Sequence, residues 1–309
     1  MKTRTLVLYS NTSTYYFDRI KGFDLSIQAV YKNEKWMKNK FLSLLRKTNS
    51  NLTSLFYGDW YNHLDDYSKI IVLDTPFSYD LKLLENIARK EPEIERFYYS
   101  WNIVRNEQLL RKEKEETQKN GFKFYCYDKG NCEKYGLYFN TIMYDETLKL
   151  PAVVPEYDTC FLGFLKDRKE KMKKLYDAFQ ATGLNARFVI VKRAGDIEDM
   201  PFEYRESEVG YYEYLDMINR SRSILDITQK GQDGLSLRIM EAIFLNKKIL
   251  TTNEYITKMD FYNPNNILVI RLGETSKDEI LEFFNKPFCG YSDATREYYS
   301  FKAWAERFK

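Results

Sequence analysis

The chain has 309 residues with a formal net charge of +3, and 44% of its residues are hydrophobic. This length usually accommodates two domains, and this composition is typical of a soluble globular protein rather than a disordered one. Four cysteines without a CxxC pair and a single histidine supply too few ligands for a zinc centre, so we expect no metal and no cofactor.

The near balance of charge also disfavours a dedicated nucleic-acid-binding protein, which would carry a concentrated excess of lysine and arginine. The first residues, MKTRTLVLYS, lack the segments of a signal peptide, and no apolar run approaches the ~20 residues that span a bilayer. These features predict a cytoplasmic protein that binds no nucleic acid.

Short apolar runs recur between longer helix-like segments, and in the first half they cover residues 4–9, 69–76, 96–102 and 122–128. The alternation resumes after a proline-bounded segment, 150–158, with runs at 159–164, 186–192, 223–227, 247–252 and 266–270. Runs that are apolar on both faces and lie ~25–40 residues apart are typical of parallel strands covered by helices. The pattern therefore predicts an α/β protein in two similar halves with a hinge at 150–158.

Helices are predicted at 105–120, at 168–182 before Gly183, and at 293–307, where no strand follows. A further helix at 32–47 places Trp36, Phe41 and Leu44 on one face and lysines on the other. Such a helix either packs on the first sheet or contacts an anionic membrane surface, because both environments select amphipathic helices.

The most informative stretch is SILDITQKGQDGLSLRIMEAIFLNKKILTTN at 223–253, where a polar loop with two glycines follows an apolar run. Ligands of open α/β sheets settle at the carboxyl ends of strands, which is where this loop lies. Ser236 is a suitable N-cap for a helix reaching about Asn246, and Arg238 in the first turn can bind phosphate oxygens. One turn later, Glu241 can accept the hydroxyls of a ribose. The alternative is a capped surface helix with an Arg–Glu pair.

Two common nucleotide motifs are absent from the chain. No GK[ST] follows the glycines, and no GxGxxG occurs, so the fingerprints of a P-loop triphosphatase and of a nicotinamide dehydrogenase are both missing. An Asp-x-Asp that would hold a catalytic cation is also missing, which disfavours a metal-dependent transferase.

The stretch 223–253 resembles the donor-binding segment of GT-B glycosyltransferases, especially bacterial proteins of lipopolysaccharide or capsule biosynthesis. Residues 159–179 and 125–140 resemble further segments of these proteins. The resemblance implies a GT-B fold, with two Rossmann-like domains whose parallel sheets face a central cleft. It implies an acceptor-binding domain at 1–152, a nucleotide-sugar-binding domain at 153–292, and a C-terminal helix at 293–309 that crosses back to the first domain.

Transferred residue by residue, the resemblance implies that Glu241 binds the ribose of the donor. The diphosphate would be held by the segment Gly234, Leu235, Ser236, Leu237 and Arg238, with positive charge from Lys166 and Arg168. Many retaining relatives carry an acidic residue seven positions before the glutamate, where this chain has Gly234. Asp233 lies one residue earlier and is a candidate for that role, so the stereochemical outcome stays open.

An inverting reaction needs a base for the acceptor hydroxyl. Asp74, at the end of an apolar run, and His63 are the candidates. The alternative for Asp74 is a helix or turn cap, and the alternative for His63 is a structural histidine. Trp101 and Asn102 follow another run and are candidate acceptor-binding residues.

The resemblance, together with the scarcity of metal ligands, implies a metal-independent, hexosyltransferase-like enzyme that transfers a sugar from a nucleotide diphosphate to a lipopolysaccharide or capsule glycan. Its expected partners are a nucleotide sugar and a glycan or lipid-linked acceptor, with peripheral contact at the inner membrane surface. The alternative is a non-catalytic glycan- or nucleotide-binding relative of the same fold.

Overall fold

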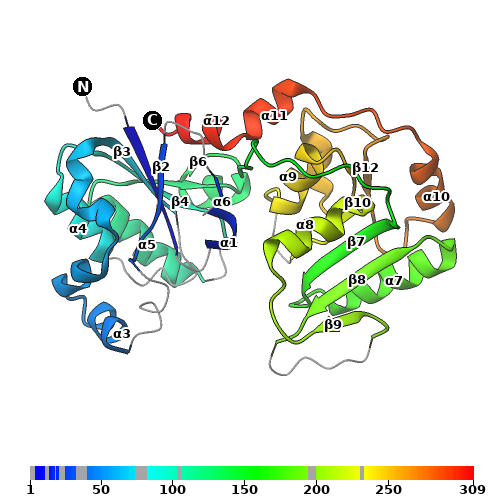
Figure 1. The fold of residues 1–309 in the computed structure, drawn as a ribbon, viewed down its shortest axis with the longest axis horizontal. Helices are drawn as coiled ribbons and strands as arrows, with labels where there is room; N and C mark the ends of the chain where they lie inside the picture. The colour runs from blue at the N-terminus through cyan, green and yellow to red at the C-terminus, as the bar shows by residue number, and fades with distance from the viewer. Residues whose placement is uncertain are drawn as a thin grey trace. The chain divides into compact units, whose positions relative to one another are not determined.

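The computed structural model describes residues 4–10, 14–17, 19–20, 25–32, 40–73, 82–102, 106–193, 200–229 and 233–309. The chain divides into two compact units, of which the first comprises Met1–Thr141 with Trp304–Lys309 and the second comprises Ile142–Ala303. Each unit is a parallel sheet with helices on its faces (Figure 1).

The first unit contains a six-stranded sheet in the order β2-β1-β3-β4-β5-β6, and every pair in it is parallel. Its strands are β1 (Arg4–Tyr9), β2 (Leu25–Ala29), β3 (Tyr67–Leu73), β4 (Glu95–Ser100), β5 (Lys123–Cys126) and β6 (Tyr138–Phe139). Four of them, β1, β3, β4 and β5, overlap the predicted apolar runs. β2 and β6 were not predicted, since β2 is only half buried and β6 has two exposed residues.

Its helices are α1 (Thr14–Phe17), α3 (Lys40–Lys47), α4 (Lys82–Lys90), α5 (Glu107–Lys119) and α6 (Lys129–Tyr135), with 3₁₀ helices η2 (Asn51–Phe56) and η3 (Asp59–Asp66). The first core cluster joins α3, α4 and α5 to one face of the sheet through residues such as Leu42, Ile87 and Leu110. The predicted helix at 105–120 is therefore confirmed. Of the predicted helix at 32–47, residues 33–39 lie outside the described residues.

The opposite face of this sheet is covered by residues from the far end of the chain. Trp304 and Phe308 are fully buried, and the Phe308 ring centroid lies 4.8 Å from that of Tyr125 and 5.6 Å from that of Phe97. The Lys69 ammonium donates a 2.8 Å hydrogen bond to the Phe308 carbonyl. Residues 304–309 are thus part of the core of the first unit.

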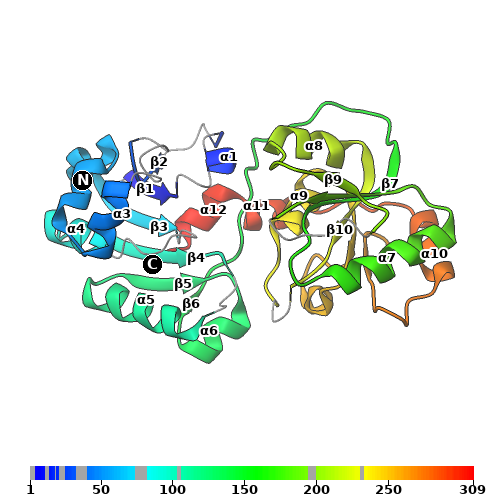
Figure 2. The same ribbon diagram turned by 90° about the horizontal axis from the view of Figure 1, so that it is seen from below.

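The second unit contains a second all-parallel sheet, in the order β12-β11-β10-β7-β8-β9 (Figure 2). Its strands are β7 (Tyr157–Phe164), β8 (Ala186–Val191), β9 (Glu203–Arg205), β10 (Ser221–Asp226), β11 (Lys248–Thr251) and β12 (Ile267–Val269). All were predicted except β9, a three-residue edge strand. The predicted α/β architecture with two parallel sheets is confirmed.

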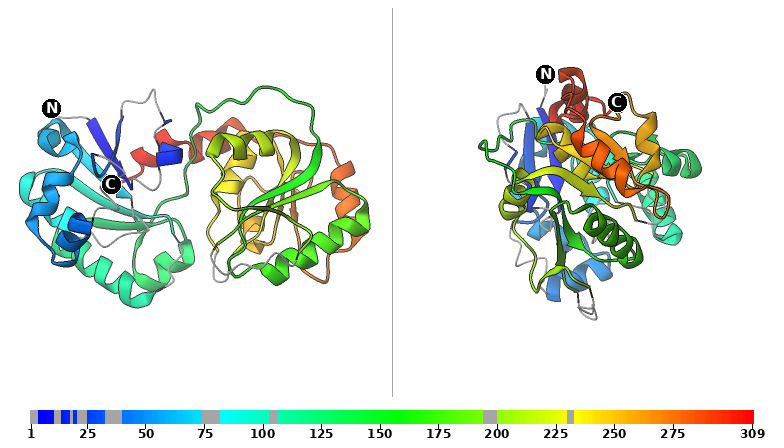
Figure 3. Two further views of the ribbon diagram at one scale, coloured as in Figure 1. Left: turned by 60° about the horizontal axis from the view of Figure 1, so that its bottom comes forward. Right: turned by 90° about the vertical axis from the view of Figure 1, so that its right-hand side faces the viewer.

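The helices of the second unit are α7 (Lys169–Thr182), α8 (Tyr211–Asn219), α9 (Leu237–Phe244), η4 (Glu254–Lys258), α10 (Lys277–Asn285) and α11 (Asp293–Tyr299), and α12 (Phe301–Glu306) continues into the first unit. Helices α7 and α10 pack together on one face of the sheet, while α8 and α9 contact β10 from the other face (Figure 3).

The single helix predicted at 293–307 is wrong, because the segment forms two helices that are separated at Ser300. Ser300 has an extended backbone and pairs with Tyr144 in a parallel bridge. The Tyr144 amide donates to the Tyr299 carbonyl, and the Phe301 amide donates to the Tyr144 carbonyl. A helix cannot continue through a residue whose neighbours bond to another segment.

No helix in the described ranges combines the length and the apolar character that crossing a bilayer requires.

Candidate active site at the switch point of the second sheet

The candidate site lies where the strand order of the second sheet changes direction. Strand β7 leads through α7 to β8 on one side, whereas β10 lies on its other side and leads to β11 further away. The loops after β7 and β10 therefore diverge at their carboxyl ends. Open α/β sheets bind ligands at such a switch point. The residues predicted to bind the donor are Lys166, Arg168, 234–238 and Glu241, and they belong to these two loops and to the helix α9 that follows the second loop.

The loop after β10 is fixed at both ends by one buried carboxylate. Asp226 ends β10 and accepts hydrogen bonds from the hydroxyls of Ser236, at 2.7 Å, and Thr251, at 2.9 Å. The side-chain amide of Asn253 also donates a hydrogen bond to the Asp233 backbone carbonyl. Ser236 occupies the predicted N-cap position of α9, but its hydroxyl bonds Asp226 instead of capping the helix. The first amide groups of α9 are therefore not capped by the Ser236 side chain.

Two arginines of the predicted diphosphate site flank the ring of Phe161 on β7. The guanidinium carbon of Arg238 lies 4.8 Å from the ring centroid and that of Arg168 lies 5.1 Å from it. Arg238 donates to the Leu162 carbonyl at 2.6 Å. A side chain at Gly163 would lie only 2.7 Å from this guanidinium, so the glycine gives Arg238 its place beside β7. The structure thus brings both arginines together.

The two arginines differ in what remains available for a ligand. Arg168 is buried and donates to the carbonyls of Phe164 and Ile227, so its hydrogen bonds connect the end of β7 to the loop after β10. Arg238 has five N–H donors. Arg238 is only half-buried, and its hydrogen bond to the Leu162 carbonyl uses one of these donors, so Arg238 retains donor capacity.

Glu241 occupies the second turn of α9 and is 1% exposed. Its carboxylate accepts hydrogen bonds from two tyrosines of α8, at 3.1 Å from Tyr211 and 2.5 Å from Tyr214. Burial raises its pKa to about 7, although the tyrosine hydroxyls and Arg238 oppose this shift. The carboxylate is therefore enclosed by tyrosines, and it does not form the surface Arg–Glu pair of the alternative interpretation.

A third tyrosine extends this cluster to the linker that precedes β7. The hydroxyl of Tyr144 lies 3.3 Å from that of Tyr211, and its ring packs 5.0 Å from that of Phe244. Burial and the nearby Glu241 raise the pKa values of Tyr144 and Tyr214, so both hydroxyls stay protonated at neutral pH. Each carboxylate oxygen has a second lone pair for a ribose hydroxyl, which can reach it only if a tyrosine moves.

The remaining predicted donor residues surround the two arginines. Lys166 is exposed and has a left-handed backbone conformation, φ 51°. Gly234 and Leu235 are buried where the loop enters α9, and Leu237 begins the helix. Asp233 is exposed beside them.

The first-unit candidates do not gather at one edge of their sheet. Trp101 and Asn102 follow β4 at its carboxyl end, where the Trp101 ring packs 5.3 Å from that of Phe17. His63 lies in η3 just before β3, and so at the amino end, where its imidazole is 59% exposed and 3.6 Å from Asp59. Asp74 follows β3 in sequence and lies outside the described residues.

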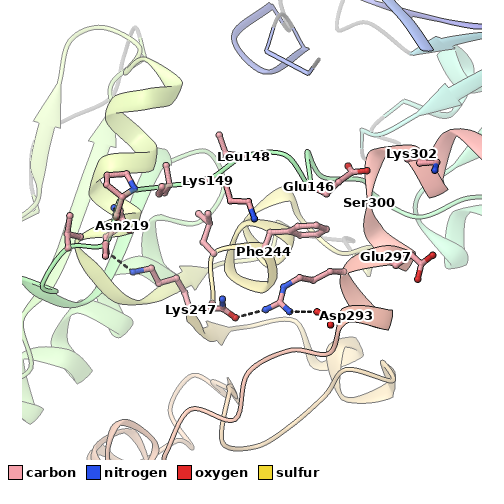
Figure 4. Close-up of a pocket in the computed structure, with 17 residues that line it drawn as sticks. Glu146, Leu148, Lys149, Asn219, Phe244, Lys247, Asp293, Glu297, Ser300 and Lys302 are labelled. Carbon is pink, nitrogen blue, oxygen red and sulfur yellow. Dashed lines mark hydrogen bonds and ion pairs between the residues drawn. The ribbon is translucent and has the colours of Figure 1, made fainter. Parts of the chain in front are cut away.

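A pocket of about 770 Å³ opens elsewhere on the second unit (Figure 4). Phe244 and Lys247 line it, and of these Phe244 is the last residue of α9 and Lys247 follows it, at the end of the helix remote from Arg238. The Lys247 ammonium donates to the Asn219 carbonyl at 2.6 Å. The pocket therefore lies at the amino edge of the sheet and is separate from the switch point.

No group of three His, Cys, Asp or Glu side chains suited to a metal ion occurs among the residues that the structure describes. The predicted absence of a metal centre stays a prediction.

Sequence reasoning missed Asp226, Asn253, Tyr211 and Tyr214. Asp226 and Asn253 lie within the stretch 223–253, and a polar residue ending a buried strand was the available signal. The tyrosines precede Glu241 by 30 and 27 residues on a separate helix, and nothing local in the sequence marks them as its partners.

No family model matches the chain, and a search of curated proteins finds no relative. Among solved structures, the chain is similar to an α-glucosyltransferase in complex with UDP and a 13-mer DNA, with a TM-score of 0.58 and 11% identity over 97% of this chain and 94% of that one. A UDP-N-acetylglucosamine 2-epimerase gives a TM-score of 0.48 with 12% identity over 99% and 94%. The glycotransferase of kitacinnamycin gives 0.42 with 10% identity over 99% and 95%. The last two scores are too low to add to the argument. The first of these likenesses, together with the two parallel sheets, shows that the chain has the GT-B fold.

Proposed function

We propose that the protein is a glycosyltransferase that uses a nucleotide diphosphate sugar as its donor. The observation that carries the proposal is that Arg238 and the amino end of α9, which the Ser236 side chain does not cap, lie together at the switch point of the second sheet. A helix amino end and an arginine with unused N–H groups both favour an anionic ligand. The similar structure that contains UDP supports a nucleotide ligand for this fold.

In this proposal, Arg238 and the amides of Leu235–Leu237 stabilise the charge that develops on the leaving diphosphate. Hydrogen-bond donors stabilise a transition state most strongly when the protein holds them in place before the reaction. The hydrogen bonds of Asp226 to Ser236 and Thr251 hold the loop in that way. Glu241 would receive the ribose, with tyrosine hydroxyls as its partners before the donor binds.

The proposed acceptor is a bacterial surface glycan of the lipopolysaccharide or capsule type, carried on a lipid. We assign acceptor binding to the first unit, with Trp101 and Asn102 as its candidate contacts. Asp74 remains the proposed base, while His63 lies at the amino edge of the first sheet and has no role in this scheme. Catalysis without a metal ion is part of the same proposal.

Duplex DNA is a second candidate acceptor. The similar α-glucosyltransferase is bound to DNA, and the first unit carries 25 Lys and Arg against 19 Asp and Glu residues. A net charge of +6 favours a polyanionic partner. Release of nucleoside diphosphate from the nucleotide sugar, measured with lipid-linked glycan or with duplex DNA, decides between the acceptors.

Calorimetry with nucleoside diphosphates tests the donor site. The Arg238→Ala variant should bind the diphosphate roughly 10- to 150-fold more weakly, which corresponds to the ~1.5–3 kcal/mol of a hydrogen bond to a charged group. Its affinity for the free nucleoside should stay unchanged.

The matched control is Arg220→Ala, because Arg220 ends α8 at the opposite edge and pairs on the surface with Asp216 and Glu156. Equal diphosphate affinity in wild type, control and folded Arg238→Ala would disprove the donor site. Binding of nucleotide sugar without turnover on any acceptor would instead support the non-catalytic alternative.

A further inference from the structure

Four large apolar side chains form an exposed patch on the first unit, which we name the α3–η2 patch. Phe41 and Leu44 on α3 are 54% and 55% exposed, and Leu52 and Leu55 on η2 are 52% and 66% exposed. The two helices contact each other, and α3 lies at the lower edge of this unit in Figure 1. Single exposed leucines are common on protein surfaces, whereas four on two adjoining helices form a patch that indicates an interaction.

The patch is a separate face from the one that holds these helices in the protein. Leu42 and Leu45 of α3 are buried, and Leu42 belongs to the core cluster of the first unit. Phe41 and Leu44 lie on the adjoining, exposed side of the same helix, with the Phe41 ring 6.2 Å from that of Phe56. Packing on the sheet therefore explains the apolar residues Leu42 and Leu45 and does not explain why Phe41 and Leu44 are both apolar and exposed.

The charged side chains on the two helices of the patch have one sign. Lys40, Arg46 and Lys47 lie on α3, and the 19 residues from 40 to 58 contain no aspartate or glutamate. Arg46 lies over the ring of Tyr31, with its guanidinium carbon 5.8 Å from the ring centroid, whereas Lys40 and Lys47 are exposed. Exposed leucine and phenylalanine side chains bordered by lysines are complementary to a surface that has an apolar interior and an anionic boundary with water.

We propose that the α3–η2 patch docks the first unit on an anionic phospholipid surface. The four apolar side chains enter the boundary between headgroups and acyl chains, and Lys40 and Lys47 remain at the level of the phosphates. Docking in this way requires neither donor binding nor sugar transfer, so its failure and the failure of the proposed transferase activity are distinguishable.

The observations favour a membrane over other occupants of the patch. A nucleic acid would be met by basic and aromatic side chains, whereas three of the four exposed residues are leucines. A stable dimer buries about 800 Å² per partner, which is more than four half-exposed side chains supply.

Sedimentation with phosphatidylcholine vesicles that contain or lack phosphatidylglycerol tests the proposal on the full chain. Wild type should bind the anionic vesicles and bind neutral vesicles at least tenfold more weakly. Leu55→Glu should reduce binding to anionic vesicles about tenfold, because it removes an apolar contact and adds repulsion. Val154→Glu, at an 85% exposed position of the second unit, introduces the same charge and should bind as wild type does.

Two double variants that remove the same charge isolate the electrostatic contribution to vesicle binding. Lys40→Gln with Lys47→Gln should weaken binding and reduce its salt dependence, whereas Lys119→Gln with Lys173→Gln, two lysines exposed elsewhere, should change neither. Equal binding to both vesicle types, or wild-type binding by folded Leu55→Glu, would overturn the proposal. So would a Leu55→Glu effect confined to dimer formation in size-exclusion chromatography or to affinity for duplex DNA.

Discussion

Glu241 illustrates how one carboxylate can be fixed by burial. Its two oxygens accept from different tyrosines of α8, and almost none of its surface is exposed. Burial of a carboxylate favours the protonated form, while hydrogen bonds from hydroxyls favour the ionised form. Because the pKa is raised to about 7, burial is the stronger effect. The residue that the family resemblance assigns to ribose binding is therefore also a titrating group near neutral pH.

This pKa predicts how stability varies with pH. Between the ordinary value of 4.5 and about 7, the native state retains a proton that the unfolded chain has lost. The free energy of unfolding contributed by Glu241 is therefore largest below pH 4.5 and falls as pH rises toward 7. At about 1.36 kcal/mol per pH unit, the total loss is roughly 3 kcal/mol.

Glu241→Gln should abolish this component while keeping a side chain that can bond both tyrosines. Urea unfolding of both proteins from pH 4.5 to 8 measures it, and the difference between wild type and variant isolates Glu241 from other titrating groups. Parallel curves for the two proteins would show that burial does not raise this pKa.

At the scale of elements, the loop between β10 and α9 depends on Asp226. Replacement with alanine leaves the hydroxyls of Ser236 and Thr251 without their acceptor inside the protein. An unsatisfied buried polar group costs about 1–3 kcal/mol. We expect Asp226→Ala to lower the free energy of unfolding by about 2 kcal/mol and to weaken diphosphate binding, because the amides before α9 lose their fixed positions.

Thermal unfolding and calorimetry measure the two effects in the same samples. Asp216→Ala is the control, since Asp216 is an exposed partner of Arg220 and its loss should cost less than about 1 kcal/mol. A destabilised Asp226→Ala protein with wild-type nucleotide affinity would assign the loop a structural role alone.

Most of the strands could be predicted because parallel strands buried on both faces give continuous apolar runs. Strand β9 could not, since three edge residues carry no such pattern, and neither could the break at Ser300, which depends on Tyr144 far away in the chain. The candidate site also has features that the sequence predicts and features that it does not. The order of Ser236, Arg238 and Glu241 is visible in the sequence, whereas the enclosure of Glu241 by α8 arises only from packing.

At the scale of the molecule, the first unit is completed by residues 304–309. Phe308 is fully buried among Phe97, Tyr125 and Trp304, and truncating a buried phenylalanine costs about 3–5 kcal/mol. We expect Phe308→Ala to lower the free energy of unfolding of the first unit by this amount. Phe288→Ala, at a 38% exposed position of the second unit, should cost much less.

Hydrogen exchange followed by mass spectrometry locates the effect. Protection should fall in β3, β4 and β5 and remain unchanged in β7 and β10, if the last residues stabilise only their own unit. Loss of protection in both sheets to the same extent would contradict this expectation and show that the chain unfolds as one cooperative body.

The position of Trp304 and Phe308 also bears on how the protein is made. A ribosome synthesises Met1–Thr141 before the second unit, yet Phe97, Tyr99 and Tyr125 on one face of this sheet lack their partners Trp304 and Phe308 until residues 304–309 follow. Domains usually fold in the order in which they emerge. Phe97, Tyr99 and Tyr125 of the nascent first unit therefore stay exposed until residues 304–309 are synthesised, and the second unit can fold first. These exposed aromatic side chains are where a chaperone would bind during translation.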